Sequence, residues 1–491
     1  MKQFKFLALI LALAMIVGIF AGCASGKTPD TTTKGNDAAD TTTKGAEGGD
    51  ETPAASVHFT MSGLPSADKT EELERYHNRQ AEYEEKTGNT YELVTFQYDY
   101  QTFAAMLEGG NLPTEFAIAN TEPQILIKNG WGKDITDIVN EYGYAEHWNP
   151  TLRELVSDKD GRIYGVPNSA YSLCLVANKA VFRAAGLVDE NDNIIYPKTW
   201  DELIETCRTI VSKTDAKGMS FTICDNMGGW NFSNVAWNYG ADLCVMNDDG
   251  SYTSNLNSEA VVKAATVYQT LSKEGLLYGD VSIDRWDDCL TNVSEGLSAM
   301  AFFHNGCAFG ICDDQGTQNM DVENMAMIPI PGGPGGNYWL MGGDTMWFSP
   351  DATDEQVRAW FEYNELFGRT PNVNDDQIAS MKEEGNLRVN ERGSVFTPDI
   401  TAYTSGDWYD AYMQVIEEYR NWKWEDMPVY EWAEKNPAHV EEEGMCQQMY
   451  ATLTSALQEI VLYPDKDIQA ILDEAQSAYQ AILDTSFDVQ K

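Results

Sequence analysis

Residues 161–211 read GRIYGVPNSAYSLCLVANKAVFRAAGLVDENDNIIYPKTWDELIETCRTIV, and this stretch decides the fold. Residues 163–167 and 171–177 are runs of strand length, and the first should end at Pro167, which has no N–H for pairing. Residues 180–185 predict a short helix that Gly186 closes in a left-handed conformation. Thr199 and Glu202 have the spacing of a capping box before an amphipathic helix. The predicted order is strand, proline loop, strand, short helix, long loop and capped helix.

This order resembles the crossover region of the extracellular solute-binding proteins of ABC importers, especially their sugar-binding, maltose-binding-protein-like branch. The segments that carry the resemblance are GRIYGVP, LVANKAVFRAAGL and PKTWDEL, with Ala177 where the family usually has the tyrosine of Y-N-K. Further segments, EGLSAMAFFHNGCAFG and MIPIPGGPGG, resemble the family's G-x-x-A-M strand and proline-glycine loop. The resemblance covers residues 57–364 well and the rest loosely. It implies an α/β, two-lobe periplasmic-binding-protein-like fold, with parallel sheets flanked by helices and a ligand cleft at the hinge.

Length and charge agree with this class. A chain of 491 residues is too long for one core and fits two lobes. The formal net charge of −44 would repel nucleic acids and anionic lipid headgroups, so we expect no nucleic-acid partner. Eight of the nine cysteines lack the dense spacing of a disulfide framework, and we expect most of them to be buried as small apolar residues.

The first 56 residues predict export and anchoring. Lys2 and Lys5 precede an apolar run over residues 6–20, which is the length of a signal peptide and short for a membrane span. The following Phe-Ala-Gly-Cys resembles a lipobox that would make Cys23 the lipidated residue; a plain secretory signal with a chance cysteine is the alternative. Residues 23–56 contain an imperfect repeat and, after Cys23, no Val, Ile, Leu or aromatic residue, which predicts a disordered tether. We therefore expect an extracellular protein held at a cell membrane of the Gram-positive type.

The resemblance also implies where the chain passes between lobes. The first crossing is expected at residues 168–170, the second at 342–344 and a third between about 369 and 405. One lobe would comprise residues 57–168 with about 344–395, and the other residues 169–343 with about 396–491. The tryptophan-rich segment 407–432 has no close match in the family pattern.

Ligands of parallel α/β sheets lie beyond the carboxyl ends of the strands. A sugar needs aromatic faces for its C–H surfaces and planar polar groups for its hydroxyls. The candidates that combine such side chains with loop or crossing positions are Ser62, Asp99, Asn120, Glu122, Asn168, Trp230, Trp286, Asn305, Trp339, Asp344 and Tyr450. Core packing is the alternative for each aromatic residue, and turn or cap bonding for each polar one. Trp230 is favoured because two glycines precede it.

Enzyme motifs are absent from the sequence. It contains five histidines and no G-x-S-x-G, H-E-x-x-H or Walker A pattern, so we expect no enzyme activity, no cofactor and no metal site. His304, Cys307 and Cys312 are metal-ligand types, but their apolar setting favours burial. The predicted function is the lipid-anchored component of an ABC importer that captures a carbohydrate, an oligosaccharide, and delivers it to the permease. A peptide or polyamine ligand, or a lipid-anchored carbohydrate hydrolase, is the alternative.

Overall fold

The computed structural model describes residues 56–486, except residues 68, 99, 248, 369 and 443. The predicted signal peptide, Cys23, the tether up to residue 55 and the candidate Asp99 therefore lie outside the described residues.

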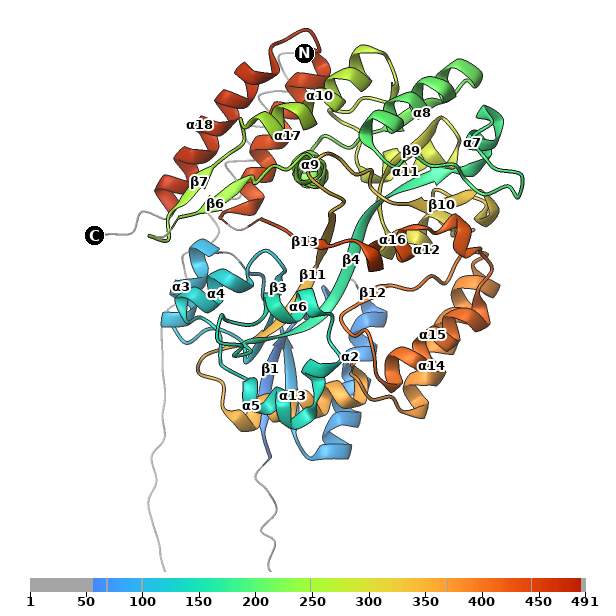
Figure 1. Ribbon diagram of the computed structural model, residues 1–491. Helices are drawn as coiled ribbons and strands as arrows, with labels where there is room; N and C mark the ends of the chain where they lie inside the picture. Colours follow the sequence, from blue (N-terminus) through green and yellow to red (C-terminus); the bar gives the residue numbers. More distant parts are fainter. Residues whose placement is uncertain are drawn as a thin grey trace, which may run out of the picture. The chain divides into compact units, whose positions relative to one another are not determined.

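A mixed sheet of eleven strands runs through the described residues (Figure 1). Its main order is β2-β1-β3-β11-β4-β9-β5-β8, with β10 and β12 paired to β4 and β13 paired to β11. The strands are β1 His58–Ser62, β2 Thr90–Val94, β3 Glu115–Ala119, β4 Gly165–Asn178, β5 Lys217–Ser220, β8 Leu277–Tyr278, β9 Ser298–His304, β10 Met325–Ile328, β11 Trp339–Phe348, β12 Ile400–Thr401 and β13 Ala438–Val440. A separate hairpin pairs β6 Cys244–Met246 with β7 Tyr252–Ser254.

Strand β4 joins the two sides of this sheet. Its first half pairs with β11, and its second half pairs with β9 and β10, all antiparallel. The sequence predicts two strands separated by a loop at Pro167, and that prediction is wrong, because one continuous strand spans Gly165–Asn178. The register against β11 shifts between Asp344 and Thr345, which leaves Asn168 as the extra residue of a bulge beside Pro167. A bulge is one of the places in a sheet where proline is tolerated.

On the β1 side of β4, helices cover both faces of the sheet (Figure 1). Phe59 and Met61 face a core with α2 and α13, while Phe116 and Ile118 face a second core with α3 and α4. The two residues of each pair lie on the same face because side chains along a strand point to alternate faces, with a period of two residues. The helices on this side are α2 Thr70–Thr87, α3 Tyr100–Glu108, α4 Pro123–Asn129, α5 Thr136–Tyr142, η1 Tyr144–Glu146, α6 Pro150–Leu155 and α13 Asp354–Phe367.

On the β9 side, the second half of β4 is buried on both faces. Leu173 and Leu175 pack into one core with α8, α9, α10, α17 and α18, and Cys174 and Val176 pack into another with α11, α12 and α15. The remaining helices are α7 Lys179–Ala185, α8 Trp200–Lys213, α9 Met227–Asn238, α10 Glu259–Lys273, α11 Trp286–Ser294, η2 Asn305–Cys307, α12 Ala308–Cys312, η3 Val322–Asn324, α14 Asp375–Asn386, η4 Leu387–Glu391, α15 Asp407–Tyr419, η5 Trp424–Asp426, α16 Val429–Lys435, α17 Cys446–Leu462 and α18 Ile468–Ser486. The tryptophan-rich segment contributes Trp408 and Trp422 to the second core.

The helix signals predicted within residues 161–211 are confirmed in part. Gly186 closes α7 with φ of 73°, as predicted. Thr199 caps α8 by accepting the backbone N–H of Glu202 at 3.2 Å. The reciprocal bond of a capping box is displaced by one residue, because the Glu202 carboxylate accepts the backbone N–H of Lys198 at 2.7 Å.

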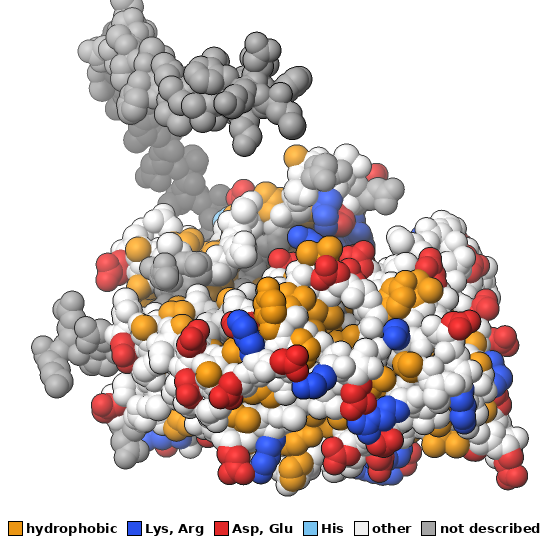
Figure 2. Space-filling view, turned by 90° about the horizontal axis from the view of Figure 1, so that it is seen from above, with side chains coloured by type: hydrophobic (Ala, Val, Ile, Leu, Met, Phe, Trp, Pro, Cys, Tyr) orange, Lys and Arg blue, Asp and Glu red, His pale blue; other side chains and the backbone are white. Residues whose placement is uncertain are grey.

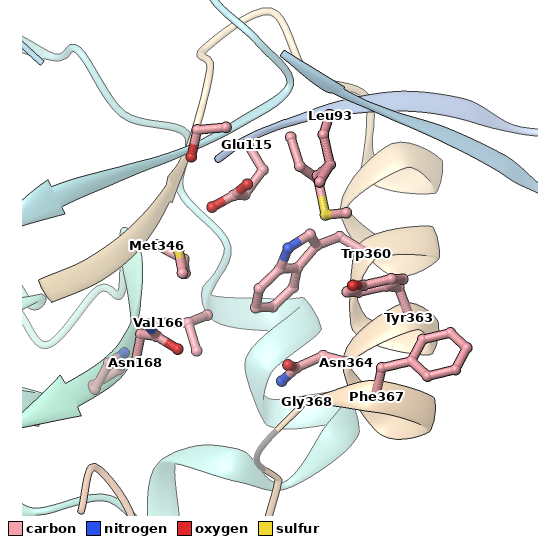
Figure 3. Close-up of a pocket in the computed structure, with 13 residues that line it drawn as sticks. Leu93, Glu115, Val166, Asn168, Met346, Trp360, Tyr363, Asn364, Phe367 and Gly368 are labelled. Carbon is pink, nitrogen blue, oxygen red and sulfur yellow. The ribbon is translucent and has the colours of Figure 1, made fainter. Parts of the chain in front are cut away.

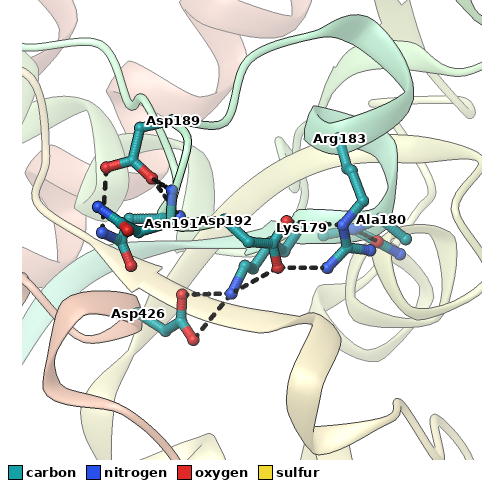
Figure 4. Close-up of polar contacts among 9 residues, drawn as sticks. Lys179, Ala180, Arg183, Asp189, Asn191, Asp192 and Asp426 are labelled. Atoms are coloured by element: carbon teal, nitrogen blue, oxygen red, sulfur yellow. Dashed lines mark hydrogen bonds and ion pairs between the residues drawn. The ribbon is translucent and has the colours of Figure 1, made fainter.

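A buried ion pair ties α7 to η5 (Figure 4). The Lys179 ammonium is 2% exposed and donates to both carboxylate oxygens of Asp426, at 2.8 and 3.0 Å. Asp192 lies 3.5 Å from the same ammonium and accepts two bonds of 2.8 Å from Arg183. The guanidinium of Arg183 and the ammonium of Lys179 lower the pKa of Asp192.

The cysteines behave as the sequence predicts. All eight that the structure describes are unbridged, and seven of them are buried. On the face seen in Figure 2, acidic and basic side chains are interspersed, with hydrophobic side chains between them. Within the described part of the chain, no helix is both long enough and apolar enough to cross a bilayer.

Candidate functional site

A cavity of about 520 Å³ lies where the two sides of the sheet meet. Its walls come from the ends of β3 and β9, the middle of β4 and β11, the first turns of α9 and α11, and the segment around α17. The residues that line it are Ala119, Tyr171, Asn226, Met227, Trp230, Trp286, His304, Cys307, Gly343, Glu441, Gln447 and Tyr450. We call this space the aromatic cavity. None of these lining residues is a lysine or an arginine.

Four rings form one continuous wall of the aromatic cavity. The ring centroids of Trp230 and Trp286 are 6.2 Å apart, and those of Trp286 and His304 are 5.7 Å apart. Tyr171 lies 4.7 Å from His304 and 6.3 Å from Trp230, centroid to centroid. Trp230 is 8% exposed, whereas Trp286 and Tyr171 are half-buried. The wall therefore combines rings held by the core with rings that have accessible faces.

Glu441 supplies the one carboxyl group among the lining residues. It is buried, and the hydroxyl of Tyr450 donates to its Oε1 at 3.0 Å. Burial, with a smaller contribution from the nearby charge of Glu122, raises the pKa of Glu441 to about 7. The Trp230 side chain also hydrogen-bonds this carboxyl group. Glu441 thus links Trp230 and Tyr450, two residues that the sequence analysis names as ligand-binding candidates.

His304 is held as a neutral ring. Its Nε2 lies 2.9 Å from the Sγ of Cys307, and burial lowers the pKa of the imidazole to about 4. Its Nδ1 is buried and has no hydrogen-bond partner in the structure. Among the described residues, no group of three or more His, Cys, Asp or Glu side chains is placed to hold a metal ion.

The structure brings five of the predicted residues to this region. Trp230, Trp286 and Tyr450 line the aromatic cavity. Asn120 and Glu122 follow β3 directly after the lining residue Ala119, and the Asn120 backbone N–H donates to the carbonyl oxygen of Gly343 at 3.1 Å. The Asn120 amide is buried without a partner for either polar atom. Burial raises the pKa of Glu122, whose carboxylate accepts the Thr121 hydroxyl at 3.0 Å.

The other described candidates lie elsewhere, each for an identifiable reason. Ser62 and Asn168 line a different cavity, and Asn168 donates to Asp344 at 2.9 Å. Asn305 is buried, and its Oδ1 accepts the backbone N–H of Ser172 at 2.8 Å. Trp339 is buried, and its indole N–H donates to the carbonyl oxygens of Ala433 and Asn436 at 3.2 and 3.0 Å. These side chains already form hydrogen bonds with other groups of the protein.

Sequence reasoning did not single out Tyr171, His304 or Glu441 as site residues. Tyr171 lies inside a predicted strand, where a buried aromatic residue is ordinary. In the structure it lies near the point where β4 passes from pairing with β11 to pairing with β9, and there it lines the cavity. His304 ends strand β9, and that end position is the signal that could have identified it. Glu441 follows β13 in the part of the chain that the resemblance covers only loosely.

Comparison with known proteins identifies the family. The sequence profile described as bacterial extracellular solute-binding protein matches residues 67–363. The chain belongs to this family. A binding protein of Brucella abortus (strain 2308) is 23% identical over 358 residues, which cover 66% of this chain and 80% of that protein.

Solved structures share the fold at low sequence identity. An ABC transporter solute-binding protein from Thermotoga lettingae, bound with α-D-tagatose, has a TM-score of 0.59 at 19% identity and covers 87% of this chain and 100% of that chain. The cyclic α-maltosyl-1,6-maltose binding protein from Arthrobacter globiformis has a TM-score of 0.59 at 19% identity and covers 88% and 100%. The predicted α/β, two-lobe binding-protein fold is therefore confirmed.

Proposed function

We propose that this solute-binding protein captures a carbohydrate, an oligosaccharide, in the aromatic cavity and passes it to the permease of an ABC importer. The observation that carries the proposal is the four-ring wall of Tyr171, Trp230, Trp286 and His304 beside the carboxyl group of Glu441. Aromatic faces suit the C–H surfaces of a sugar ring, and a carboxyl group accepts its hydroxyl protons.

The charge of the cavity supports a neutral ligand. Because none of the described lining residues is a lysine or an arginine, an anionic ligand would meet Glu441 without a compensating cation among them. The cavity volume of about 520 Å³ lies within the range usual for small-molecule sites. The ligands named for two proteins of the same fold, tagatose and cyclic maltosyl-maltose, are also neutral carbohydrates.

A cationic ligand such as a polyamine, or a peptide, is the second candidate. Aromatic rings around a carboxyl group also suit an ammonium ion, and Glu122 adds a second nearby acid. A hydrolase has less support, since retaining and inverting glycosidases need a pair of catalytic carboxyl groups. Among the described lining residues, Glu441 is the one that carries a carboxyl group. We propose that the protein is not an enzyme.

We further propose extracellular anchoring through a diacylated Cys23, with residues 23–56 as a tether. The proposed lobes are residues 57–168 with about 344–395, and residues 169–343 with about 396–491. Mass spectrometry of the native protein tests the anchor. A lipid on residue 23 supports it, and an unmodified residue 23 or cleavage elsewhere contradicts it.

A thermal-shift panel tests the ligand class. Neutral mono- and oligosaccharides, polyamines and short peptides are added separately to the purified protein. We expect stabilisation by at least one neutral oligosaccharide, with no new reducing ends after incubation. Stabilisation by polyamines alone would favour the second candidate, and release of reducing ends would establish the hydrolase.

A further inference from the structure

A second cavity, of about 230 Å³, lies between the sheet and helix α13 (Figure 3). Its walls come from the ends of β1 and β2, the start of β3, the bulged part of β4, strand β11 and the C-terminal half of α13. We call it the α13 pocket. It shares no lining residue with the aromatic cavity, so the two spaces can be tested separately.

Glu115 gives the α13 pocket its one acidic group. Its side chain is 3% exposed, and Figure 3 shows the carboxyl group turned into the pocket. The carboxyl group accepts the backbone N–H of Ser62, while its Oε1 is buried with no partner in the structure. A buried polar atom without a partner costs free energy, which a bound molecule with a matching group would recover.

The state of this carboxyl group is set by its surroundings. Burial, with a smaller contribution from the charge of Asp344, raises the pKa of Glu115 to about 8. None of the described residues that line the pocket is a lysine, arginine or histidine that could oppose these effects. At neutral pH the group is therefore a neutral carboxylic acid, which offers one O–H donor and one carbonyl acceptor.

The rest of the pocket combines apolar and aromatic side chains with the polar side chains of Ser62, Asn168 and Asn364. Trp360, Tyr363 and Phe367 project from successive turns of α13, and Met346 lies on the opposite wall (Figure 3). Trp360 is buried by the core beneath it, so its ring is a fixed surface. A flat apolar body would pack against these rings, and a hydroxyl group would both donate to and accept from Glu115.

We propose that the α13 pocket is a second binding site, which takes a small neutral alcohol with a flat apolar body. The size fits, because an apolar cavity of about 150 Å³ holds benzene and the α13 pocket has about 230 Å³. An anion would be repelled by Asp344, and none of the described lining residues is a cation that could pair with it. The Arg79 guanidinium lies 5.6 Å from the ring centroid of Phe367 but is not among these lining residues. An amine would have to lose the water around its ammonium group in an aromatic pocket.

Benzyl alcohol is the probe, titrated into the full-length protein and followed by isothermal calorimetry. We expect saturable binding at one site in the millimolar range, as is usual for so small a ligand. Glu115→Leu should weaken binding by at least about tenfold, because it removes the hydroxyl's partner. Glu115→Gln, whose amide also donates and accepts, should change it by less than about threefold. Trp286→Ala, in the aromatic cavity, should leave it unchanged.

A second variant tests the same pocket independently, so that the proposal remains testable if Glu115→Leu does not fold. Met346→Phe narrows the pocket from the opposite wall without touching the carboxyl group, and it should also abolish binding. The proposal is overturned if benzyl alcohol does not saturate, if Glu115→Leu binds as well as the wild type, or if benzylamine binds more tightly than benzyl alcohol. A crystal structure grown with benzyl alcohol that shows only water at Glu115 would overturn it as well.

Discussion

The side-chain amide of Asn168 donates to the carboxylate of Asp344 at 2.9 Å, across 176 residues of chain. The Ser169 hydroxyl donates to the other oxygen of the same carboxylate. Both Asn168 and Asp344 are ligand candidates from the sequence, yet they satisfy each other at the bulge where β4 meets β11. Asp344 therefore holds two crossing strands together.

We predict that Asp344→Ala destabilises the free protein. Two hydrogen bonds to a charged acceptor are lost in a partly buried position, at a cost of about 1.5 kcal/mol or more. Ligand affinity should change by less than about threefold, which is under 1 kcal/mol. Thermal unfolding and calorimetric titration measure both effects. An unchanged melting temperature with an affinity loss of about tenfold would contradict this prediction and show that Asp344 contributes to ligand binding.

A second prediction concerns Lys128, on α4 in the β1 side. Its ammonium donates to the carbonyl oxygen of Gly250 at 3.1 Å, in the turn between β6 and β7, and lies 5.7 Å from the ring centroid of Tyr252. This contact joins the β1 side to the β6–β7 hairpin, whose Tyr252 belongs to the core of the β9 side. Its loss should therefore favour an open arrangement. Lys128→Met should weaken ligand binding by about two- to fivefold, since the bond is exposed.

Lys133→Met is the matched control for Lys128→Met. Lys133 pairs with Asp354 at 2.9 Å within the β1 side and makes no such bridge. It should alter stability slightly and leave the affinity unchanged. Equal effects of both variants on affinity would mean that only net charge matters.

A third prediction is a pH dependence set by Glu115. Its pKa is raised to about 8 in the folded protein, against an ordinary value of 4.5. Between these values the folded protein holds a proton that the unfolded chain has released. The contribution of Glu115 to the free energy of unfolding is therefore fully present below pH 4.5. It falls as the pH rises toward about 8, by up to about 1.4 kcal/mol per pH unit. Glu115→Gln should remove this slope.

Urea unfolding of both proteins between about pH 5 and pH 8 measures the difference. The comparison cancels the contributions of Glu122 and Glu441, whose pKa values are also raised. Parallel curves for the wild type and Glu115→Gln would show that Glu115 ionises normally.

A fourth prediction concerns the ion pair of Lys179 and Asp426. Removing one partner of a buried pair costs about 3–5 kcal/mol, because it leaves an uncompensated charge. Lys179→Met should be the more damaging change, since Asp192 remains 3.5 Å from Lys179 when Asp426 is replaced. The double variant Lys179→Met with Asp426→Leu should lose less than the two single changes together. Additive losses in chemical unfolding would contradict this coupling.

Sequence reasoning worked where the signal is local. The Thr199 cap, the Gly186 helix end and the apolar runs of β4 each depend on a few neighbouring residues, and the structure contains all three. It failed at Pro167, because the bulge that accommodates this proline is created by pairing with a strand about 180 residues later.

The site was harder to predict because its residues meet through long-range packing. Trp230 and Trp286 stand near turn signals, so the sequence could indicate them. Glu441 is brought to Trp230 and Tyr450 by the pairing of β13 with β11 and by the docking of α17 against α9. The polar candidate Asn305 directly follows β9, and Asp344 lies within β11. Sequence position alone does not reveal that the backbone N–H of Ser172 and the side chain of Asn168 already bond these two groups.

Carbohydrate binding in the aromatic cavity is tested at Trp286, whose half-buried ring lines that cavity. Trp230 is a less clean test, because it is 8% exposed and part of the core, so its removal would also cost about 3–5 kcal/mol of stability. Trp424, which is 37% exposed and lies outside the aromatic cavity, provides the matched control.

The measurement is calorimetric titration of the best stabilising oligosaccharide into the wild type, Trp286→Ala and Trp424→Ala. Loss of a stacking ring should weaken binding by at least about tenfold in Trp286→Ala, while Trp424→Ala binds as the wild type does. Unchanged affinity in Trp286→Ala, with its melting temperature also unchanged, would contradict carbohydrate binding in the aromatic cavity.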